Sequence, residues 1–416
     1  MSKALADRFR HLTASLDPAD PEYATQVVDL LLAEARAASV SDIHLQPSAE
    51  GLEIRWRIDG VLQAIGTLPK SVAPNVVARL KVLAELLTYQ TDRPQEGRLR
   101  AEPGAVETRV STMPTLQGEK AVVRLFAGQG RFLRLDDLDF SDESIATLRR
   151  SLVETAGMIV LAGPAGSGKT TSLYACLREL AESSAGARSL VTLEDPIEVA
   201  VPGVSQSQVR PQAGFTLESG LRSLLRQDPE VIAVGEIRDA STAAVAFQAA
   251  LTGHLVLPTF HAGSAAGAIG RLSDMGIEPY LLRSGLLAIL SQRLARRLCE
   301  TCSRPIDLHS EPDARLGLDV DRAWKAVGCE ACRGTGYLSR FPLVELLVPG
   351  AGDLGRALFA RNDVARIEEL ASKAGMISRW DRARQAIEAG RTTTEEVRRV
   401  LGFSVRKPDE GSAPKT

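Results

Sequence analysis

The spacing of apolar residues along the chain follows two patterns, one with a helical period and one with a period of two residues. From Gln26 the segment QVVDLLLAEARAA spaces its apolar residues as an amphipathic helix. Apolar and polar residues then alternate with period two, and Asp59-Gly60 supplies a tight hairpin turn. The predicted strands lie at 42–45, 52–58, 107–112 and 120–126. With a second helix over 76–87, they predict a PAS-like α/β sandwich at 23–127.

Longer, wholly apolar runs follow and alternate with helical segments. The predicted buried strands lie at 158–161, 189–193, 231–234 and 255–257. Because parallel strands covered on both faces are apolar throughout, we expect a mainly parallel, RecA-like sheet over 137–298. A cysteine-bearing module at 299–340 and a helical subdomain at 341–403 are expected after it.

The remaining segments are predicted to be connections or ends. Residues 1–22 are polar and end in Pro18 and Pro21, which predicts a flexible lead-in. Gly128-Gln129-Gly130 indicates a linker over 128–136. The tail at 404–416 is rich in Lys, Pro, Gly and Ser, and we expect it to be disordered.

Composition narrows the class of protein. The 50 basic and 52 acidic residues leave a net charge of −2, which argues against coating of a nucleic-acid duplex through bulk positive charge. No apolar run is long enough for a transmembrane helix, and the N-terminus lacks the apolar core of a signal peptide. Five cysteines in so long a chain do not indicate a disulfide framework. We therefore expect a cytoplasmic multidomain protein.

A phosphate-binding loop is the strongest chemical signal. The segment 163–170 is a complete GxxxxGK[ST] motif between a buried strand and a helix. Its glycines let backbone N–H groups face phosphates, Lys169 can reach the β and γ phosphates, and Thr170 can hold Mg²⁺. The expected ATP-binding residues are Gly163, Pro164, Ala165, Gly166, Ser167, Gly168, Lys169, Thr170 and Thr171.

Two acidic residues end neighbouring strands. Glu194 follows the strand at 189–193 and Glu236 follows the strand at 231–234. Both would lie at the phosphate-loop edge of a parallel sheet, where one can activate water and the other can hold Mg²⁺. Capping of the next helix is the alternative for each. His261 could contact the γ-phosphate, although a lone loop histidine is often only solvated.

Four cysteines have metal-ligand spacing. Cys299-x-x-Cys302 and Cys329-x-x-Cys332 can fold as two knuckles that form one tetrahedral sulfur site. Zinc in a structural role is the expected metal, iron would accept the same ligands, and free or redox-active thiols are the alternative. The nearby basic run of Arg293, Arg296 and Arg297 could face an anionic partner or lie solvated on a helix surface.

The ordered motifs resemble one known family. The pieces are SDIHLQP at 41–47, RWRIDGVL at 55–62, PQEGR at 94–98, GPAGSGKTTSLY at 163–174, TLEDPIE at 192–198, RQDPEVIAVGEIRD at 226–239 and TGHLVLPTFHA at 252–262. Together they resemble the ATPases that power type II secretion and type IV pilus assembly, over about Gln26 to Gly402. The four-cysteine module is similar to that of the zinc-containing secretion and pilus-assembly branch.

The resemblance implies roles for particular residues. It makes Glu194 the catalytic acid, Glu236 the Walker B acid and Mg²⁺ ligand, and His261 part of a histidine box. It also implies that Arg109 and Arg124 of the sandwich close on the nucleotide. Such guanidinium groups would neutralise charge that develops on the transferred phosphoryl group.

The sequence also departs from the family pattern. Related sequences usually carry a further domain before the sandwich, whereas only residues 1–22 precede it here, so docking through that domain is not expected. The histidine box contains Pro258 and Phe260 at positions where the family commonly has a small residue and Leu. Because proline lacks an N–H donor, strand pairing is expected to end at Pro258.

Three functions remain open at this point. The first is a cytoplasmic ATPase motor, implied to be a homohexamer that acts on an inner-membrane platform protein of a secretion or pilus machine. The second is a nucleic-acid translocase on a RecA-like core, which the charge balance and 4% aromatic residues do not favour, so no nucleic acid is expected. The third is a regulator or scaffold that binds ATP without hydrolysing it.

Overall fold

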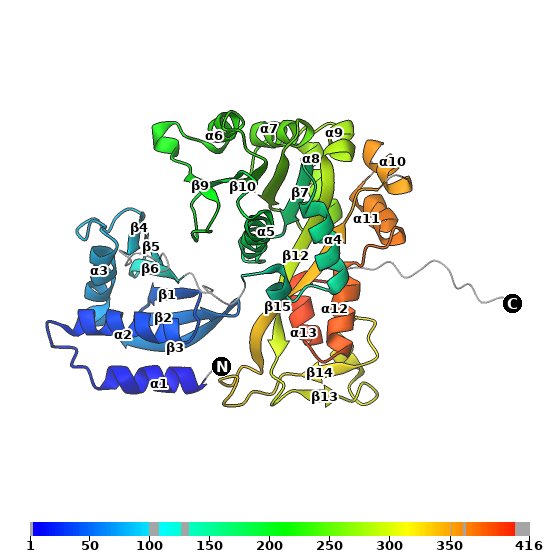
Figure 1. Ribbon diagram of the computed structural model, residues 1–416. Coiled ribbons are helices and arrows are strands. Elements are labelled where there is room, and N and C mark those ends of the chain that lie inside the picture. The colour runs from blue at the N-terminus through cyan, green and yellow to red at the C-terminus, as the bar shows by residue number, and fades with distance from the viewer. Residues whose placement is uncertain (1–2, 100–107, 126–132, 351, 361–362, 404–416) are drawn as a thin grey trace.

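The computed structural model describes residues 3–99, 108–125, 133–350, 352–360 and 363–403. A small domain built on an antiparallel sheet lies beside a larger α/β domain (Figure 1). Residues 128–132 of the expected linker at 128–136 and the tail at 404–416 lie outside the described residues, as do Glu107 and Phe126, at the ends of two predicted strands. The rest of the expected linker is described, and it enters a short 3-10 turn over Leu135–Leu138 in which Leu135 is buried.

The N-terminal sandwich has six antiparallel strands in the order β3-β2-β1-β6-β5-β4. They are β1 Asp42–Pro47, β2 Gly51–Ile58, β3 Val61–Pro69, β4 Gln95–Leu99, β5 Thr108–Thr115 and β6 Gly118–Leu125. Helices α2 (Tyr23–Ala37) and α3 (Ala73–Leu83) bury their apolar faces in the same core as the inward strand residues. The predicted sandwich and its hairpin at Asp59-Gly60 are present.

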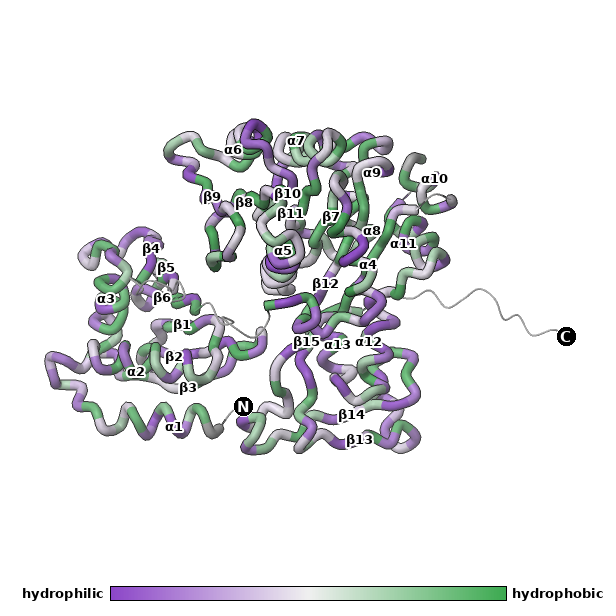
Figure 2. The backbone as a smooth tube through the Cα atoms, viewed as in Figure 1, coloured by the Kyte–Doolittle hydropathy of each residue, from purple (hydrophilic) through white to green (hydrophobic). Residues whose placement is uncertain are grey.

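The expected flexible lead-in is wrong for most of its length. Helix α1 spans Lys3–Ala14, and hydrophobic and hydrophilic residues alternate along it (Figure 2). Phe9 is buried and meets the Trp56 ring edge to face at 6.2 Å between centroids. The sequence did not predict this helix because its composition is mostly polar. Of its larger apolar residues, only Leu5 and Phe9 pack into the core.

The larger domain is built on a seven-stranded sheet in the order β15-β12-β7-β11-β10-β8-β9. Its strands are β7 Gly157–Ala162, β8 Leu190–Glu194, β9 Ser205–Gln208, β10 Val231–Ile237, β11 Leu255–Phe260, β12 Leu286–Leu298 and β15 Tyr337–Leu347. Every neighbouring pair is parallel except β12 with β15, so the mainly parallel RecA-like sheet is confirmed. The helices within this part of the chain are α4 Asp142–Leu152, α5 Lys169–Ser184, α6 Leu217–Leu224, α7 Ala240–Leu251, α8 Ala265–Asp274 and α9 Pro279–Gly285.

Strand pairing does not end at Pro258. The proline lies opposite Val234 of β10, and β11 continues to Phe260. Toward β7, the register passes from Val256 to Thr259 and so skips the proline. A parallel strand alternates the side to which successive residues donate, which allows one missing donor to be tolerated within β11.

The expected helical subdomain at 341–403 contains four helices, but its first residues, 341–347, belong to strand β15. The long strands β12 and β15 pair antiparallel and extend the main sheet, so Arg293, Arg296 and Arg297 lie on a strand rather than on a helix. Arg296 pairs with the buried Glu396 at 2.7 Å, and Arg297 bonds Asp139. The basic run is therefore at least partly engaged within the chain.

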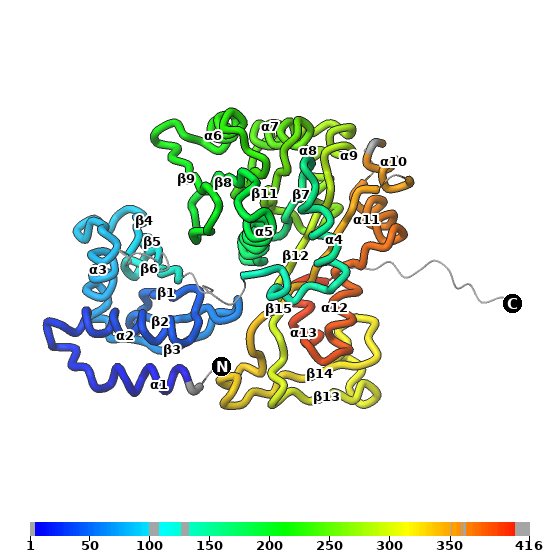
Figure 3. Tube along the Cα trace, in the orientation of Figure 1, coloured from blue at the N-terminus to red at the C-terminus, as the bar shows by residue number. Residues whose placement is uncertain are grey.

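The end of the chain folds back onto this hairpin. Short strands β13 (Arg304–Ile306) and β14 (Ala323–Lys325) pair beside the cysteines. The C-terminal helices are α10 Asp353–Phe359, α11 Val364–Lys373, α12 Arg379–Glu388 and α13 Thr394–Leu401. Helix α12 contacts β14 and β15, and α13 contacts β12 (Figure 3). Among the described residues, every helix is too short or too polar to cross a bilayer.

Candidate nucleotide and metal sites

The phosphate loop lies where the sequence places it, between β7 and α5. Gly163 and Gly168 have φ of 151° and 92°, values that a side chain rarely allows. A Cβ on Gly163 would lie 2.4 Å from Ser167 Oγ, so this position also lacks room for one. Thr170 and Thr171 at the start of α5 are exposed, and their hydroxyls are therefore accessible to a ligand.

Lys169 folds back over its own loop. Its Nζ donates to the carbonyl oxygens of Gly163 at 2.9 Å and Pro164 at 3.0 Å. Burial lowers the pKa of Lys169, and the negative charge of Glu236 opposes that shift. The electrostatic influence of Glu236 on Lys169 connects the end of β10 with the loop that follows β7.

Glu194 ends β8 as a buried carboxylate that accepts three hydrogen bonds. The residue is 3% exposed. Tyr174 Oη donates to Oε2, while Thr192 Oγ1 at 2.6 Å and Gln206 Nε2 at 3.0 Å donate to Oε1. Burial and the neighbouring Glu194 raise the pKa of Tyr174, so the phenol stays protonated and remains a donor.

Tyr174 and Gln206 were not anticipated from the sequence. Tyr174 also accepts the backbone N–H of Glu198 at 3.1 Å, which joins α5 to the segment that follows Glu194. Tyr174 ends the GPAGSGKTTSLY segment on the helix that opens at the phosphate loop. Gln206 lies on the short polar strand β9, whose sequence carries no comparable signal.

Glu236 and His261 lie at the ends of the two strands between β8 and β7. Glu236 is half-buried and accepts from Arg238 Nε at 2.7 Å. His261 is exposed just beyond β11, and its backbone carbonyl accepts from Arg271. The parallel arrangement therefore brings Glu194, Glu236, His261 and the phosphate loop to one edge of the sheet.

The two predicted arginines are cross-strand neighbours, since Arg109 of β5 lies opposite Arg124 of β6. Arg109 Nη2 is 4.0 Å from Glu198 Oε2 and so connects the sandwich to the ATPase domain. Arg124 is largely exposed and bonds Asp42 of its own domain at 3.0 Å. In this conformation only Arg109 of the pair has a described contact with the larger domain.

The four cysteine sulfurs form one cluster. All four sulfurs lie within 4.8 Å of one another, and Cys299–Cys329, Cys302–Cys332 and Cys329–Cys332 are each 3.8 Å apart. Tetrahedral zinc with bonds of about 2.3 Å requires sulfur–sulfur distances of about 3.8 Å. The cluster thus fits zinc in both ligand type and spacing.

Backbone amides support thiolate character at this cluster. Gly328 N–H lies 3.3 Å from Cys302 Sγ, while Cys329 and Gly336 N–H groups lie 3.1 Å and 3.2 Å from Cys332 Sγ. Burial raises the pKa of Cys302 to about 12. At Cys332 these amides, together with hydrogen bonds from the Cys329 and Cys302 side chains, outweigh burial and bring the pKa to about 6. Metal binding requires the thiolate form, which such donors stabilise.

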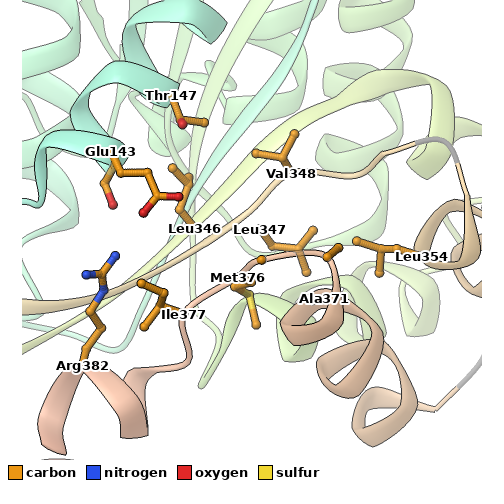
Figure 4. A pocket seen from close by; sticks show the side chains of 13 residues that line it. Glu143, Thr147, Leu346, Leu347, Val348, Leu354, Ala371, Met376, Ile377 and Arg382 are labelled. Carbon is orange, nitrogen blue, oxygen red and sulfur yellow. The ribbon is translucent and has the colours of Figure 1, made fainter. Parts of the chain in front are cut away.

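One small pocket lies away from both sites. It has a volume of about 130 Å³ and is lined by residues of α4, the end of β15, α11 and α12 (Figure 4). Glu143 and Arg382 face it from one side, and Leu347, Leu354 and Met376 line the other. We assign it no role in nucleotide chemistry.

Fold and site together define a P-loop ATPase with a RecA-like core. The sequence matches the family model described as "Type II/IV secretion system protein" over residues 17–399. The chain belongs to this family.

Individual proteins named for type II secretion or type IV pilus assembly are similar to the chain in sequence. The chain is 39% identical to the type II secretion system protein HxcR of Pseudomonas aeruginosa, covering 95% of this chain and 81% of that one. It is 38% identical to the type II secretion system ATPase E of Vibrio cholerae, covering 95% and 79%. The type IV pilus assembly ATPase PilB of Thermus thermophilus is 40% identical to this chain. The match covers 91% of this chain but only 43% of the length of PilB.

Solved structures share the fold. The ATPase DotB of Legionella pneumophila superposes with a TM-score of 0.65 at 21% identity, covering 92% of this chain and 97% of DotB. The pilus retraction motor PilT gives a TM-score of 0.59 at 21% identity, covering 89% and 95%. These likenesses support the two-domain architecture described above.

Proposed function

We propose that this chain hydrolyses ATP at residues 163–171 and that the hydrolysis drives type II secretion or type IV pilus assembly. The family and the relatives named for secretion and pilus assembly support the process. One observation carries the chemistry. The phosphate loop, Glu194 and Glu236 share one edge of the parallel sheet. The negative charge of Glu236 also acts on the pKa of Lys169 in the loop.

The loop would bind the phosphates through its backbone N–H groups and the N-terminus of α5. Lys169 would exchange its bonds to the Gly163 and Pro164 carbonyls for bonds to phosphate oxygens. Thr170 and Glu236 would hold Mg²⁺, which neutralises charge on the phosphates when bound. Mg²⁺ suits this donor set, because it prefers hydroxyl, carboxylate and water oxygens.

Glu194 would accept the proton of the attacking water. A carboxylate offers about four acceptor positions, and three here are occupied by Tyr174, Thr192 and Gln206. The remaining position lies on Oε2. The three donors fix the side chain, so the remaining acceptor position is held in one orientation for the proton transfer.

Arg109 and Arg124 would stabilise charge on the transferred phosphoryl group when the sandwich closes on the ATPase domain. Arg109 already contacts that domain at Glu198. ATP binding would then favour closure and hydrolysis would release it, which converts chemistry into relative movement of two domains.

The cysteine cluster would hold zinc in a structural role. Its four protein ligands leave no open position for substrate. Zinc would tie the end of β12 to the start of β15, and so would stabilise the hairpin that extends the main sheet.

We further propose a homohexamer at the cytoplasmic face of the inner membrane, acting on a platform protein of the machine. Domain closure in one subunit can then be passed to its neighbours and to the membrane partner. This assembly follows the family resemblance and the relatives' roles in secretion and pilus assembly.

Steady-state ATP turnover with and without Mg²⁺ tests the enzymatic proposal, and size measurement with ATP tests the oligomer. We expect Mg²⁺-dependent turnover that DNA and RNA do not stimulate. Stimulation by nucleic acid would favour a translocase, and absence of turnover in the oligomer would favour a regulator.

A further inference from the structure

Gln292 is a buried polar side chain that touches the phosphate loop from a distant part of the sequence. It lies on β12 and is 2% exposed. Its Nε2 donates to the Ser167 carbonyl oxygen at 2.7 Å, and Ser172 Oγ donates to its Oε1 at 2.9 Å. Because a carbonyl oxygen can only accept, the contact with Ser167 fixes which way the amide faces.

Two loop glycines make room for this residue. A Cβ on Gly163 would lie 2.6 Å from the Gln292 carbonyl oxygen, and a Cβ on Gly168 would lie 2.8 Å from Gln292 Nε2. Both distances are shorter than real side chains show. The glycines at these two positions of the motif therefore serve contact with β12 as well as backbone conformation.

The contact has a geometric consequence for the loop. In a planar trans peptide, the carbonyl and the following N–H point in opposite directions. When Gln292 holds the Ser167 carbonyl, the N–H of Gly168 is turned away from β12. Loss of that restraint would let the peptide rotate and would present a carbonyl oxygen where an anion needs a donor.

We propose that Gln292 is a positioning residue of the nucleotide site, one that sets the orientation of the peptide between Ser167 and Gly168 for phosphate binding. This inference rests on the proposed ATP site at the loop. It assigns a task to β12, a strand that carries no motif residue of that site.

The test uses Gln292→Glu, which keeps the shape and the acceptor for Ser172. When ionised, the new carboxylate cannot donate to the Ser167 carbonyl; when protonated, its O–H can. Burial raises the pKa of a carboxyl group, so lowering the pH restores the donor. Mg²⁺-ATP affinity is measured by calorimetry at pH 8 and pH 5.5, each relative to wild type at the same pH.

We expect Gln292→Glu to bind Mg²⁺-ATP about tenfold more weakly than wild type at pH 8, the size expected for an unsatisfied buried acceptor. The deficit should shrink to about threefold or less at pH 5.5 as the donor returns. Gln292→Met, which has no donor, should stay weak at both pH values. Gln248→Glu, the same change at an exposed position on α7, should match wild type throughout.

Wild-type affinity in Gln292→Glu at pH 8, or a deficit that pH does not change, would overturn the proposal. If that variant does not fold, Ser172→Ala tests the same arrangement by removing the partner of Oε1, with about threefold weaker binding expected. Unchanged affinity there would also contradict it. Wild type that binds no ATP would refute the ATP site itself, a result distinct from both.

Discussion

Arg109 of the sandwich lies 4.0 Å from Glu198 of the ATPase domain and forms an ion pair between the two. Glu198 also donates its backbone N–H to Tyr174, whose hydroxyl donates to Glu194. A chain of polar contacts therefore runs from a cross-strand arginine pair to the buried acid at the end of β8. The catalytic proposal assigns this series of contacts a role in hydrolysis, and each contact can be tested by substitution.

Arg124→Ala should lower kcat by about tenfold to a hundredfold while changing ATP affinity by less than about threefold. The reason is that Arg124 is exposed here and would meet the nucleotide only in the closed state. Steady-state kinetics and equilibrium ATP binding measure the two effects. Arg150→Ala, an exposed arginine on α4, is the matched control. Equal losses of kcat and affinity would contradict the role.

Tyr174→Phe should reduce kcat by about tenfold and lower the free energy of unfolding by about 2 kcal/mol. The variant removes a donor to Glu194 Oε2 and an acceptor for Glu198 N–H without changing the shape of the ring. Turnover assays and denaturant unfolding measure the effects. Loss of stability without loss of turnover would show that the hydroxyl only supports the fold.

Purified protein should contain about one zinc per chain, and Cys329→Ser should lose most of it, because a structural zinc site needs all four ligands. Elemental analysis and thermal unfolding measure the metal and its effect on stability. Cys176→Ala is the control, since Cys176 is buried on α5 outside the cluster. Fully folded wild type without metal would contradict the structural assignment.

Glu396→Gln should lower the free energy of unfolding by about 3 kcal/mol at pH 7, because it breaks a buried ion pair with Arg296. Burial alone would raise the pKa of Glu396, but bonds from Arg399 and Arg296 hold it below its ordinary value. A carboxylate with a lowered pKa stabilises the fold above its unfolded pKa and loses that effect as pH falls through the folded pKa. The difference from wild type should therefore shrink in acid, and a difference independent of pH would refute this account.

Local motifs in the sequence were sufficient to predict the phosphate loop, the strand-end acids and the four-cysteine cluster. Glycine, lysine and cysteine patterns carry their chemistry at fixed short spacing, and buried parallel strands are apolar throughout. The position of Gly163 and the convergence of Cys299 with Cys329 follow from these patterns. Contacts between residues far apart in the sequence do not follow from such patterns.

The features that the sequence did not predict depend on tertiary contacts. β12 contains Arg293, Arg296 and Arg297, and their charges suggested an exposed helix, whereas Glu396 and Asp139 from distant segments neutralise two of them. In the sequence, nothing distinguishes Tyr174, Gln206 and Gln292 from other polar residues. Only the fold brings the first two into contact with Glu194 and the third into contact with the phosphate loop.

Turnover and binding by Glu194→Gln test the catalytic proposal most directly. The amide keeps the size of the side chain but cannot take a proton, so kcat should fall by about a hundredfold or more while Mg²⁺-ATP affinity stays within about threefold of wild type. Turnover near the wild-type rate in a folded variant would show that the acid at the end of β8 does not activate the water.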